Sequence, residues 1–355
     1  MSGQQTRQWV LYNPPRKSPV VLSGPNSTFA IQSATLPPPG ANEVLLQILY
    51  FSNDPGQRGW ISADVDLERQ YLAPVQKGQV MKSFAICEVL ESKSENITKG
   101  QLVMATTTGW TEYAVVDAKL VTPIQPDEAA GIRATHFIGV LGVPGITAYY
   151  GLADIAHATK DDIVVISGAG GATGSMVVQV AKHLIGSKKV IGIAGGAEKC
   201  KWVESLGADV CVDYKAMNFK EELWRATEGF VDVYFDNVGG EILDLMLQRV
   251  RRFGRITACG SISSYNGHLQ SITRWGEIVT NRLEVRGFIV FDTMGTPRGA
   301  EIVDALKRGI RDGKIKVGIA DETVIPTRFE DVPRTWMGLF EGKNQGKLVT
   351  ELIKV

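Results

Sequence analysis

The sequence predicts an α/β protein in which a doubly wound parallel sheet is joined to an all-β, barrel-like domain. From residue 1 to about 130, Pro and Gly interrupt short apolar or alternating runs, as in NPPRKSP, LPPPGANE and NDPGQRG. From about 143 to 318, an apolar strand, a glycine-rich turn and a helix follow one another several times. The last 35 or so residues return to strand, short helix and strand, and these strands need a sheet to pair with.

The expected strands follow from this pattern in order. In the first part they are the runs at 43–51, 84–92, 101–110 and 111–121. In the second part they are 162–167, 189–195, 208–214, 231–238, 255–261 and 284–291. Between the first two strands of the second part, Val177, Val180, Ala181 and Leu184 recur at helical spacing, and Gly186 suits the end of that helix.

The composition is that of a folded protein without a strong overall charge. Hydrophobic residues make up 44% and charged residues 21% of the 355 residues, as in ordinary globular domains. The 38 Lys and Arg balance the 38 Asp and Glu, so no global field attracts nucleic acid or anionic lipid. The N-terminal stretch has no signal-peptide core, and no apolar run is long enough to span a membrane. We expect a cytoplasmic protein with neither nucleic acid nor membrane as a partner.

The cysteines and histidines do not form a metal-binding pattern. The 4 cysteines and 4 histidines are scattered, without C-x-x-C or H-x-x-x-H spacing. The sequence therefore predicts no metal site, and the thiols are expected to be small buried hydrophobes; they are Cys87, Cys200, Cys211 and Cys259.

A glycine-rich turn stands between the first strand of the parallel sheet and the helix after it. Gly168, Gly171 and Gly174 form G-x-x-G-x-x-G within VVISGAGGATGSMVVQVAKHL. In this context one glycine permits a tight turn, another lets a pyrophosphate approach the backbone, and the third lets helix and strand pack closely. A packing turn without a ligand is the alternative, because 38 glycines produce spaced glycines by chance. The strand and helix around the turn favour a Rossmann dinucleotide site.

The end of the second strand favours NADP over NAD. An NAD site places an acid there to hold the ribose hydroxyls, whereas this strand runs into AGGA at 194–197. Glu198 follows closely, so NAD is not excluded. Lys199 and Lys201 open the next helix and suit a 2′-phosphate, although each could also be a solvated side chain on that helix.

Six stretches carry a resemblance to a known family. They are VPGITAYYGL at 143–152, the glycine loop, VDYK at 212–215, YFDNVGG at 234–240, GSISSYN at 260–266 and NQGKLV at 344–349. In this order they resemble the zinc-independent medium-chain dehydrogenase/reductases, in particular the prostaglandin reductase and alkenal double-bond reductase branch. The resemblance implies a GroES-like domain of residues 1–130 and 319–355, a Rossmann domain of residues 131–318, and a cofactor cleft where they meet.

The resemblance also implies an activity and an assembly. Similar proteins use NADPH to reduce the carbon–carbon double bond of α,β-unsaturated ketones and aldehydes, and they carry no zinc. Many of them form homodimers by joining the edge strands of their Rossmann sheets, and RLEVRGFIVF at 282–291 is the corresponding edge. We therefore expect a homodimeric NADPH-dependent enzyme with a small unsaturated carbonyl substrate.

Site residues are implied in the same way. Lys199 matches a lysine that pairs with the 2′-phosphate, and Tyr265 matches a tyrosine that faces the substrate carbonyl. Without the resemblance, Asn237 could simply cap a turn, Asn344 could lie in a surface hairpin, and Tyr265 could be a loop aromatic. The implied cofactor-binding residues are Gly168, Gly171, Ala172, Thr173, Gly174, Lys199, Tyr214, Asn237, Ser261, Tyr265, Phe288, Val290, Asn344 and Gly346.

One position departs from the family. Where its members commonly have D-P-Y-M-R, this chain has DPGQR at 54–58, with Gly56 in place of the tyrosine. The substitution opens space or removes a hydrogen-bond donor near the substrate carbonyl, which points to a larger substrate. The predicted substrate pocket comprises Asn53, Gly56 and Tyr265. The side chains that could refill it, or could be plain core, are Trp60, Trp110 and Trp275.

The mechanism expected for this activity needs no metal. Adding hydride to the β-carbon of an enone leaves negative charge on the carbonyl oxygen, and a protonated phenol such as Tyr265 can donate a hydrogen bond to it. A ribose hydroxyl of the cofactor is the second donor, and the α-carbon proton comes from Tyr265 or water. Other readings stay open: a quinone reductase or specialised pathway enzyme on the same scaffold, or a non-catalytic NADPH-binding protein. A zinc alcohol dehydrogenase would lack its ligands here.

Overall fold

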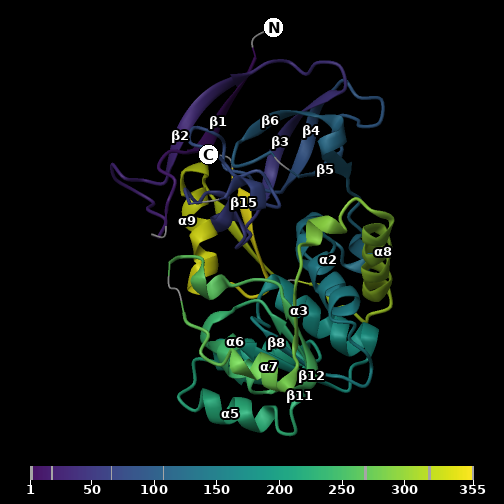
Figure 1. Ribbon diagram of the computed structural model, residues 1–355. Coiled ribbons are helices and arrows are strands. Elements are labelled where there is room, and N and C mark those ends of the chain that lie inside the picture. The colour runs from purple at the N-terminus through teal and green to yellow at the C-terminus, as the bar shows by residue number, and fades with distance from the viewer. Residues whose placement is uncertain are drawn as a thin grey trace. The chain divides into compact units, whose positions relative to one another are not determined.

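The chain folds into two compact units (Figure 1). A computed structural model describes residues 3–16, 19–64, 66–106, 108–267, 270–318 and 321–353. The first unit comprises Met1–Ile138, Thr323–Lys343 and Leu348–Val355, and the second comprises Gly139–Glu322 and Asn344–Lys347. The division into substrate and cofactor domains at residues 130 and 319 stays a prediction.

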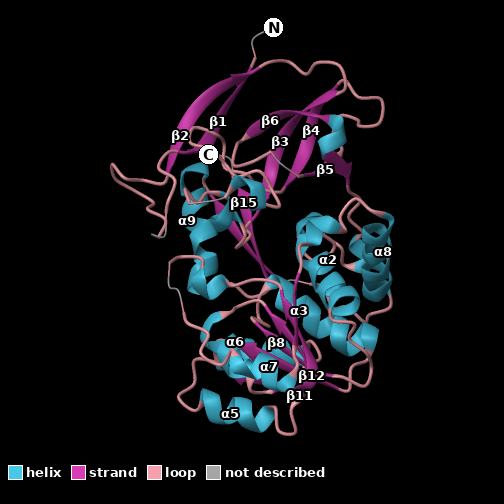
Figure 2. Ribbon diagram, in the orientation of Figure 1, coloured by secondary structure: helices cyan, strands magenta, loops and turns pink. Residues whose placement is uncertain are grey.

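The second unit is built on a six-stranded parallel sheet (Figure 2). Its strands are β8 (Ile163–Ser167), β9 (Lys189–Ala194), β10 (Val210–Asp213), β11 (Val231–Asp236), β12 (Val250–Ala258) and β13 (Glu284–Gly287). Their order in the sheet is β10-β9-β8-β11-β12-β13, and the neighbouring strands pair in parallel. This is the strand order of a Rossmann fold, so the predicted doubly wound sheet is confirmed.

Helices connect and cover these strands. They are α2 (Val143–Tyr149), α3 (Ala172–Gln179), α4 (Ala197–Ser205), α5 (Phe219–Ala226), α6 (Gly240–Leu247), α7 (Gly276–Asn281) and α8 (Pro297–Arg311). The helix predicted after the glycine loop is confirmed: α3 continues in wider π-type turns over Val180–Ile185 and ends at Gly186, which has φ +77°. On its predicted packing face, Val177 and Val180 are fully buried and Leu184 is partly buried.

The last two predicted strands of this sheet have different limits in the structure. β12 begins earlier than predicted, at Val250, and ends at Ala258. The prediction of a strand over 284–291 is wrong for its second half, because β13 ends at Gly287 and Val290–Asp292 forms a 3₁₀ turn. Gly287 pairs with Ala258, the last residue of β12, so the residues after it have no neighbouring strand to bond.

The first unit is rich in antiparallel strands, as predicted. Its strands are β1 (Gln4–Leu11), β2 (Phe29–Leu36), β3 (Glu43–Ser52), β4 (Ala85–Ser92), β5 (Leu102–Ala105), β6 (Tyr113–Asp117), β7 (Val121–Pro123), β14 (Glu322–Thr327) and β15 (Lys347–Leu352). β1 pairs with β2, and the larger sheet has the order β14-β15-β3-β4-β5-β7, with β6 also on β3. The C-terminal part forms β14, α9 (Val332–Met337) and β15, and β15 pairs with β3.

Each unit has its own apolar core. In the second unit, the inward faces of the strands and helices form one cluster that includes Val165, Ile191 and Tyr234. In the first unit, Trp110 packs between Phe29 and Trp336, with ring centroids 5.1 and 5.6 Å away. Trp110 is fully buried and is therefore a core residue rather than a wall of a pocket. Trp275 is 66% exposed, so it is not a core residue, and its place in a substrate pocket stays a prediction.

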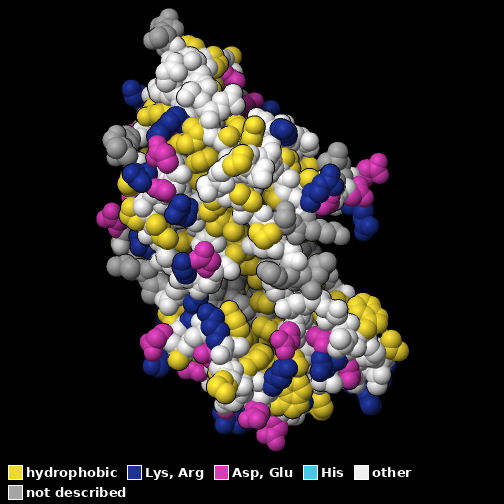
Figure 3. Space-filling view, turned by 90° about the vertical axis from the view of Figure 1, so that its left-hand side faces the viewer, with side chains coloured by type: hydrophobic (Ala, Val, Ile, Leu, Met, Phe, Trp, Pro, Cys, Tyr) yellow, Lys and Arg dark blue, Asp and Glu magenta, His cyan; other side chains and the backbone are white. Residues whose placement is uncertain are grey.

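Charged side chains of both signs lie on the surface (Figure 3). On the face seen in Figure 3, Lys and Arg side chains are intermingled with Asp and Glu side chains, in keeping with a net charge of 0. Within the described ranges, every helix is too short or too polar to cross a lipid bilayer.

Candidate cofactor and substrate sites

The three glycines of the loop between β8 and α3 differ in what they require. Gly168 has φ +60°, in the left-handed region that favours glycine. A Cβ on Gly174 would lie 2.2 Å from the carbonyl oxygen of Gly168, so helix and turn touch there through bare backbone. A Cβ on Gly171 would lie 3.4 Å from that oxygen, an ordinary contact. Gly171 thus leaves the N-terminus of α3 uncovered, which is the cradle that a pyrophosphate needs.

A C-terminal segment lies against this loop. The Gly346 N–H donates to the carbonyl of Gly170 at 3.0 Å, and Asn344 Nδ2 donates to the carbonyl of Gly346 at 2.8 Å. Gly346 has φ +62°, and a Cβ there would lie 1.9 Å from the carbonyl oxygen of Asp321. The structure therefore brings Asn344 and Gly346 to the glycine loop, far from it in sequence.

Lys199 joins the same group from α4. Its side chain crosses Gly170, where a Cβ would lie 2.3 Å from Lys199 Cδ, and its Nζ donates to the carbonyl of Asn344 at 2.7 Å. Burial lowers the pKa of the Lys199 ammonium, and the charge of Lys215 lowers it further. A dianionic phosphate beside Lys199 would offset both effects.

The adjoining ends of β9 and β10 are tied together by one carboxylate. Asp213 Oδ1 accepts from the N–H of Gly196 at 2.7 Å and from the N–H of Lys215 at 2.9 Å. The Tyr214 ring lies on Gly195, where a Cβ would come within 2.7 Å of it. Tyr214 is 43% exposed, so one face of the ring is accessible to a ligand.

Sequence reasoning missed Lys215 and included Lys201. Lys215 follows Tyr214 in VDYK, and the order β10-β9 sets the end of β10 beside the end of β9. That neighbour relation was the signal that could have identified it. Lys201 instead pairs with Glu198 at 2.9 Å, with both side chains mostly in solvent. The structure does not bring Lys201 into the group around Lys199.

Asn237 is held at the ends of β8 and β11. Its N–H donates to Ser167 Oγ at 3.0 Å, and its Nδ2 donates to the carbonyl of Ser167 at 2.7 Å. The preceding Asp236 is buried and accepts from Ser167 Oγ at 2.9 Å and from Tyr234 Oη at 2.8 Å. The nearby charge and burial both raise the pKa of Tyr234, with burial the larger cause. Asn237 therefore has a fixed position at the carboxyl edge of the sheet.

Tyr265 and Ser261 lie in one loop after β12. Tyr265 Oη accepts from the N–H of Ser261 at 3.2 Å, and it lies 3.3 Å from where a Cβ on Gly260 would be. Ser261 Oγ lies 2.9 Å from Ser264 Oγ. The structure thus brings Tyr265, Ser261 and Gly260 together in this loop.

The side chains of Phe288 and Val290 pack within the second unit. The Phe288 ring packs edge-on against Tyr150 and Phe235, at centroid distances of 5.8 and 6.2 Å. It also covers Gly151, where a Cβ would lie 2.5 Å from Phe288 Cζ. The Val290 side chain is buried. With these side chains packed, the main chain suits the role beside the nicotinamide that the resemblance implies.

The predicted residues Ala172 and Thr173 are the first two residues of α3.

The predicted substrate residues of the first unit differ from each other. The Asn53 side chain is buried and donates through Nδ2 to Thr350 Oγ1 at 2.9 Å, which joins the end of β3 to β15. Gly56 precedes α1 (Gln57–Trp60) with an ordinary helical backbone, φ −58° and ψ −26°. A Cβ on Gly56 would have one described neighbour within 4 Å, Tyr71 Oη at 3.3 Å.

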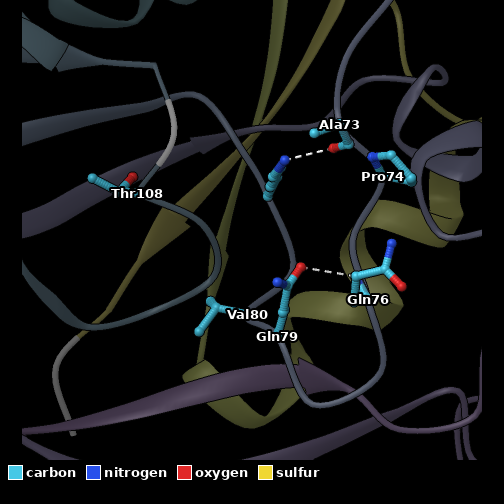
Figure 4. Close-up of a pocket in the computed structure, with 7 residues that line it drawn as sticks. Ala73, Pro74, Gln76, Gln79, Val80 and Thr108 are labelled. Atoms are coloured by element: carbon cyan, nitrogen blue, oxygen red, sulfur yellow. Dashed lines mark hydrogen bonds between the residues drawn. The ribbon is translucent and has the colours of Figure 1, made fainter. Parts of the chain in front are cut away.

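A cavity of about 550 Å³ lies in the first unit (Figure 4). Its wall includes Ala73, Pro74, Lys82 and Thr108, and none of the predicted site residues lines it. Lys82 Nζ donates to the carbonyl of Ala73 across it at 2.5 Å, and burial lowers the pKa of that ammonium. The cavity therefore adjoins the segment that carries Tyr71 without including Gly56.

Two family models match the chain. One, described as the N-terminal domain of oxidoreductase, matches residues 7–124, and the other, described as zinc-binding dehydrogenase, matches residues 172–307. Among the described residues, no group of three or more His, Cys, Asp and Glu side chains could hold a metal ion.

Whole-length relatives extend these matches. Prostaglandin reductase 1 of Bos taurus is 33% identical over 330 residues, covering 92% of this chain and 94% of that protein. The NADPH-dependent curcumin reductase of Escherichia coli (strain K12) is 33% identical over 353 residues, covering 98% of this chain and 96% of that protein. The crystal structure of CurA from Vibrio vulnificus in complex with NADPH is 35% identical, with a TM-score of 0.85 over 98% of this chain and 100% of that one.

Proposed function

Because the chain belongs to the medium-chain dehydrogenase/reductase superfamily, and within it to the prostaglandin reductase and curcumin reductase branch, we propose that it is an NADPH-dependent reductase. Its substrate is an α,β-unsaturated ketone or aldehyde, in which the carbon–carbon double bond is reduced. The names of two relatives support the cofactor, since one is an NADPH-dependent curcumin reductase and another binds NADPH in a crystal.

The observation that carries the proposal is the basic end of the glycine loop. The methylene carbons of Lys199 lie over Gly170, its Nζ donates to the Asn344 carbonyl at 2.7 Å, and Lys215 is close enough to lower the pKa of Lys199. Two ammonium groups beside bare backbone and a helix N-terminus fit the phosphates of NADPH. Lys199, Lys215 and Tyr214 would hold the 2′-phosphate, and Gly171 with the first turn of α3 would hold the pyrophosphate.

When bound, the cofactor supplies the hydride that adds to the substrate β-carbon. The protein's own part is to orient the substrate and stabilise the negative charge that develops on its carbonyl oxygen. Tyr265 would do this by donating a hydrogen bond from its hydroxyl to that oxygen. The fixed amide of Asn237 and the backbone of Phe288 and Val290 keep the cofactor-binding edge of the sheet in one position.

The direct test is the rate of NADPH oxidation, beside NADH, with small and bulky α,β-unsaturated ketones and aldehydes and with quinones. The proposal requires turnover with enones and a preference for NADPH over NADH. The product must be the saturated ketone or aldehyde. Turnover restricted to quinones would replace the proposed substrate class. Tight NADPH binding without any turnover would replace the enzyme with a binding protein.

The proposal includes a homodimer formed through the edge of the parallel sheet. β13 is the last strand in the sheet order, its four residues are exposed, and exposed edge strands pair readily with another chain. Val285 on it is 48% exposed, and Val279 on the preceding α7 is 73% exposed. Light scattering at micromolar concentration should give twice the chain mass. The mass of one chain would refute the dimer and leave the activity untouched.

A further inference from the structure

The cavity of the first unit contains a basic side chain without an acidic partner. Lys82 lines this cavity, whose volume of about 550 Å³ is in the range of small-molecule sites (Figure 4). Its Nζ donates to the carbonyl of Ala73 at 2.5 Å, and an ammonium has further N–H groups to donate. Among the described residues no carboxylate pairs with Lys82, and burial lowers the pKa of its ammonium without an opposing negative charge. A bound anion would supply that charge.

A hydroxyl of the same wall also lacks a partner. Thr108 lines the cavity, and its Oγ1 atom is buried without a hydrogen-bond partner among the residues that the structure describes. Leaving a buried hydroxyl without a partner costs free energy, so such groups are rare in folded proteins. A ligand oxygen in the cavity would accept the hydrogen bond that Thr108 does not make within the protein.

Backbone contacts hold these two donors on adjoining segments. The Trp110 N–H donates to the carbonyl of Met81 at 2.8 Å. Gly109 has φ +78°, and a Cβ there would lie 2.5 Å from the same carbonyl oxygen. Thr108 precedes Gly109 and Lys82 follows Met81 in the chain. The two donors are therefore carried by segments whose backbones touch, and their positions do not depend on a flexible loop contact.

The rest of the cavity wall adds a further donor and no negative charge. Gln79 Oε1 accepts from the N–H of Gln76 at 2.9 Å, which leaves the Gln79 NH₂ group to donate. No Asp or Glu is among the described residues that line the cavity, and its other lining residues are Ala73, Pro74 and Val80. Donors beside apolar side chains suit an oxyanion at the end of an apolar chain.

We propose that this cavity is a subsite for a carboxylate of the unsaturated carbonyl substrate, which Lys82 and Thr108 bind. The inference rests on the proposed function and narrows its substrate class to enones and enals with an acidic tail. The cavity lies in the unit that is predicted to bind the substrate. Its donors contact the tail and not the reacting double bond, so they act on KM and leave kcat unchanged.

The first test compares an enone acid with its methyl ester, at several tail lengths. At the best length the wild-type KM should be about 10-fold lower for the acid, as expected for one charge-assisted hydrogen bond at a partly exposed site. Lys82→Met should raise the KM of the acid to that of the ester, with the KM of the ester and of NADPH unchanged. An acid preference that is absent from the wild-type enzyme, or that survives in Lys82→Met, overturns the inference.

Lys77→Met is the matched control for charge. Lys77 belongs to the same segment but does not line the cavity, and its Nζ lies 5.4 Å from the centre of the Tyr12 ring. This variant should keep the preference for the acid. An equal loss of preference in both lysine variants would mean that general surface charge attracts the acid, and it would overturn the subsite.

Thr108→Val separates a ligand contact from a structural one. Because the Thr108 hydroxyl has no described partner in the free protein, its removal should leave Tm unchanged and raise the KM of the acid alone by about 3-fold. A lower Tm with an unchanged KM of the acid would contradict the role of Thr108. A wild-type enzyme that reduces no enone would refute the proposed function, whereas turnover of acid and ester with equal KM values refutes only the carboxylate subsite.

Discussion

Gly174 of the second unit and Gly56 of the first are both predicted site residues without a side chain, but the backbone requires glycine at only one of them. Gly174 is a glycine because a Cβ would lie 2.2 Å from a backbone oxygen that cannot move away. Gly56 has ordinary dihedral angles, and its one described neighbour is a side-chain hydroxyl at 3.3 Å. The fold therefore demands the first glycine, whereas the backbone conformation does not demand the second.

This difference separates glycines that the stability of the fold requires from glycines that affect which ligand binds. Where backbone packs on backbone, a substitution changes the fold before it changes binding. Where a glycine borders open space, a substitution changes what can bind and leaves the fold intact. Four predictions test this contrast and the chemistry assigned to the second unit.

The largest effect is expected at the packing glycine. Gly174→Ala should lower the free energy of unfolding by about 3 kcal/mol, because overpacking against fixed backbone cannot relax. Gly171→Ala is the matched control, since its Cβ would make an ordinary contact at 3.4 Å, and it should keep its stability while losing NADPH affinity. Urea unfolding and NADPH titration measure the two quantities. Equal stability of the two variants would remove the distinction between the two loop glycines.

The next effect is on the chemical step. Tyr265→Phe should lower kcat for enone reduction by about 100-fold, as expected for removing a donor to a developing oxyanion. Ser264→Ala is a suitable control, because Ser264 Oγ lies 2.9 Å from Ser261 Oγ in the same loop and carries no phenol. Stopped-flow traces at saturating NADPH give kcat directly. An unchanged kcat in Tyr265→Phe would end its assignment to the carbonyl oxygen.

A smaller effect concerns cofactor choice. Lys199→Met should weaken NADPH binding by about 10- to 100-fold, the value of one charged hydrogen bond, and should leave NADH binding unchanged. Lys201→Met is the control, because Lys201 pairs with Glu198 in solvent, and its NADPH Kd should stay within about 2-fold. Fluorescence titration of both cofactors measures this. A parallel loss of NADPH affinity in both lysine variants would mean that general surface charge, not Lys199, selects the cofactor.

The two regions also differ in how far the sequence could predict them. The glycine loop and its flanking strand and helix follow from local pattern. The position after the second strand pointed to Lys199 and Lys201 alike, and the family resemblance then favoured Lys199. Lys215 was missed because its role depends on which strand neighbours β9, a property of the sheet and not of the segment.

The contact between Gly56 and Tyr71 could be predicted only in part. The sequence identifies Gly56 as unusual, but nothing in its spacing links it to Tyr71, since the two meet through irregular loops and not through a periodic element. The same holds for the tryptophans, because the local sequence does not distinguish Trp60, Trp110 and Trp275. Only the structure shows that the first donates to Tyr71, the second is a core residue and the third is exposed. Irregular contacts of this kind depend on tertiary structure, so local pattern does not reveal them.

The smallest predicted effect is a pH dependence of cofactor preference. Burial and the charge of Lys215 lower the pKa of Lys199 below the ordinary lysine value of about 10.4 in the free protein, and a bound 2′-phosphate raises it again by favouring the charged form. Between the two pKa values binding takes up a proton, so NADPH affinity falls as pH rises through that window, by less than about 10-fold per pH unit for one group. NADH lacks the phosphate, so the ratio of the two Kd values between pH 8 and pH 10 isolates Lys199 from other titrations.

Lys199→Arg makes this last prediction decisive. A guanidinium keeps its charge at every pH in the range, so the variant should bind NADPH with a Kd ratio that stays flat from pH 8 to pH 10. A flat ratio in the wild-type protein would mean that the Lys199 ammonium keeps its proton despite its burial, and that the phosphate end of the site is more solvated than its contacts indicate. A slope that persists in Lys199→Arg would contradict the assignment of the pH dependence to Lys199.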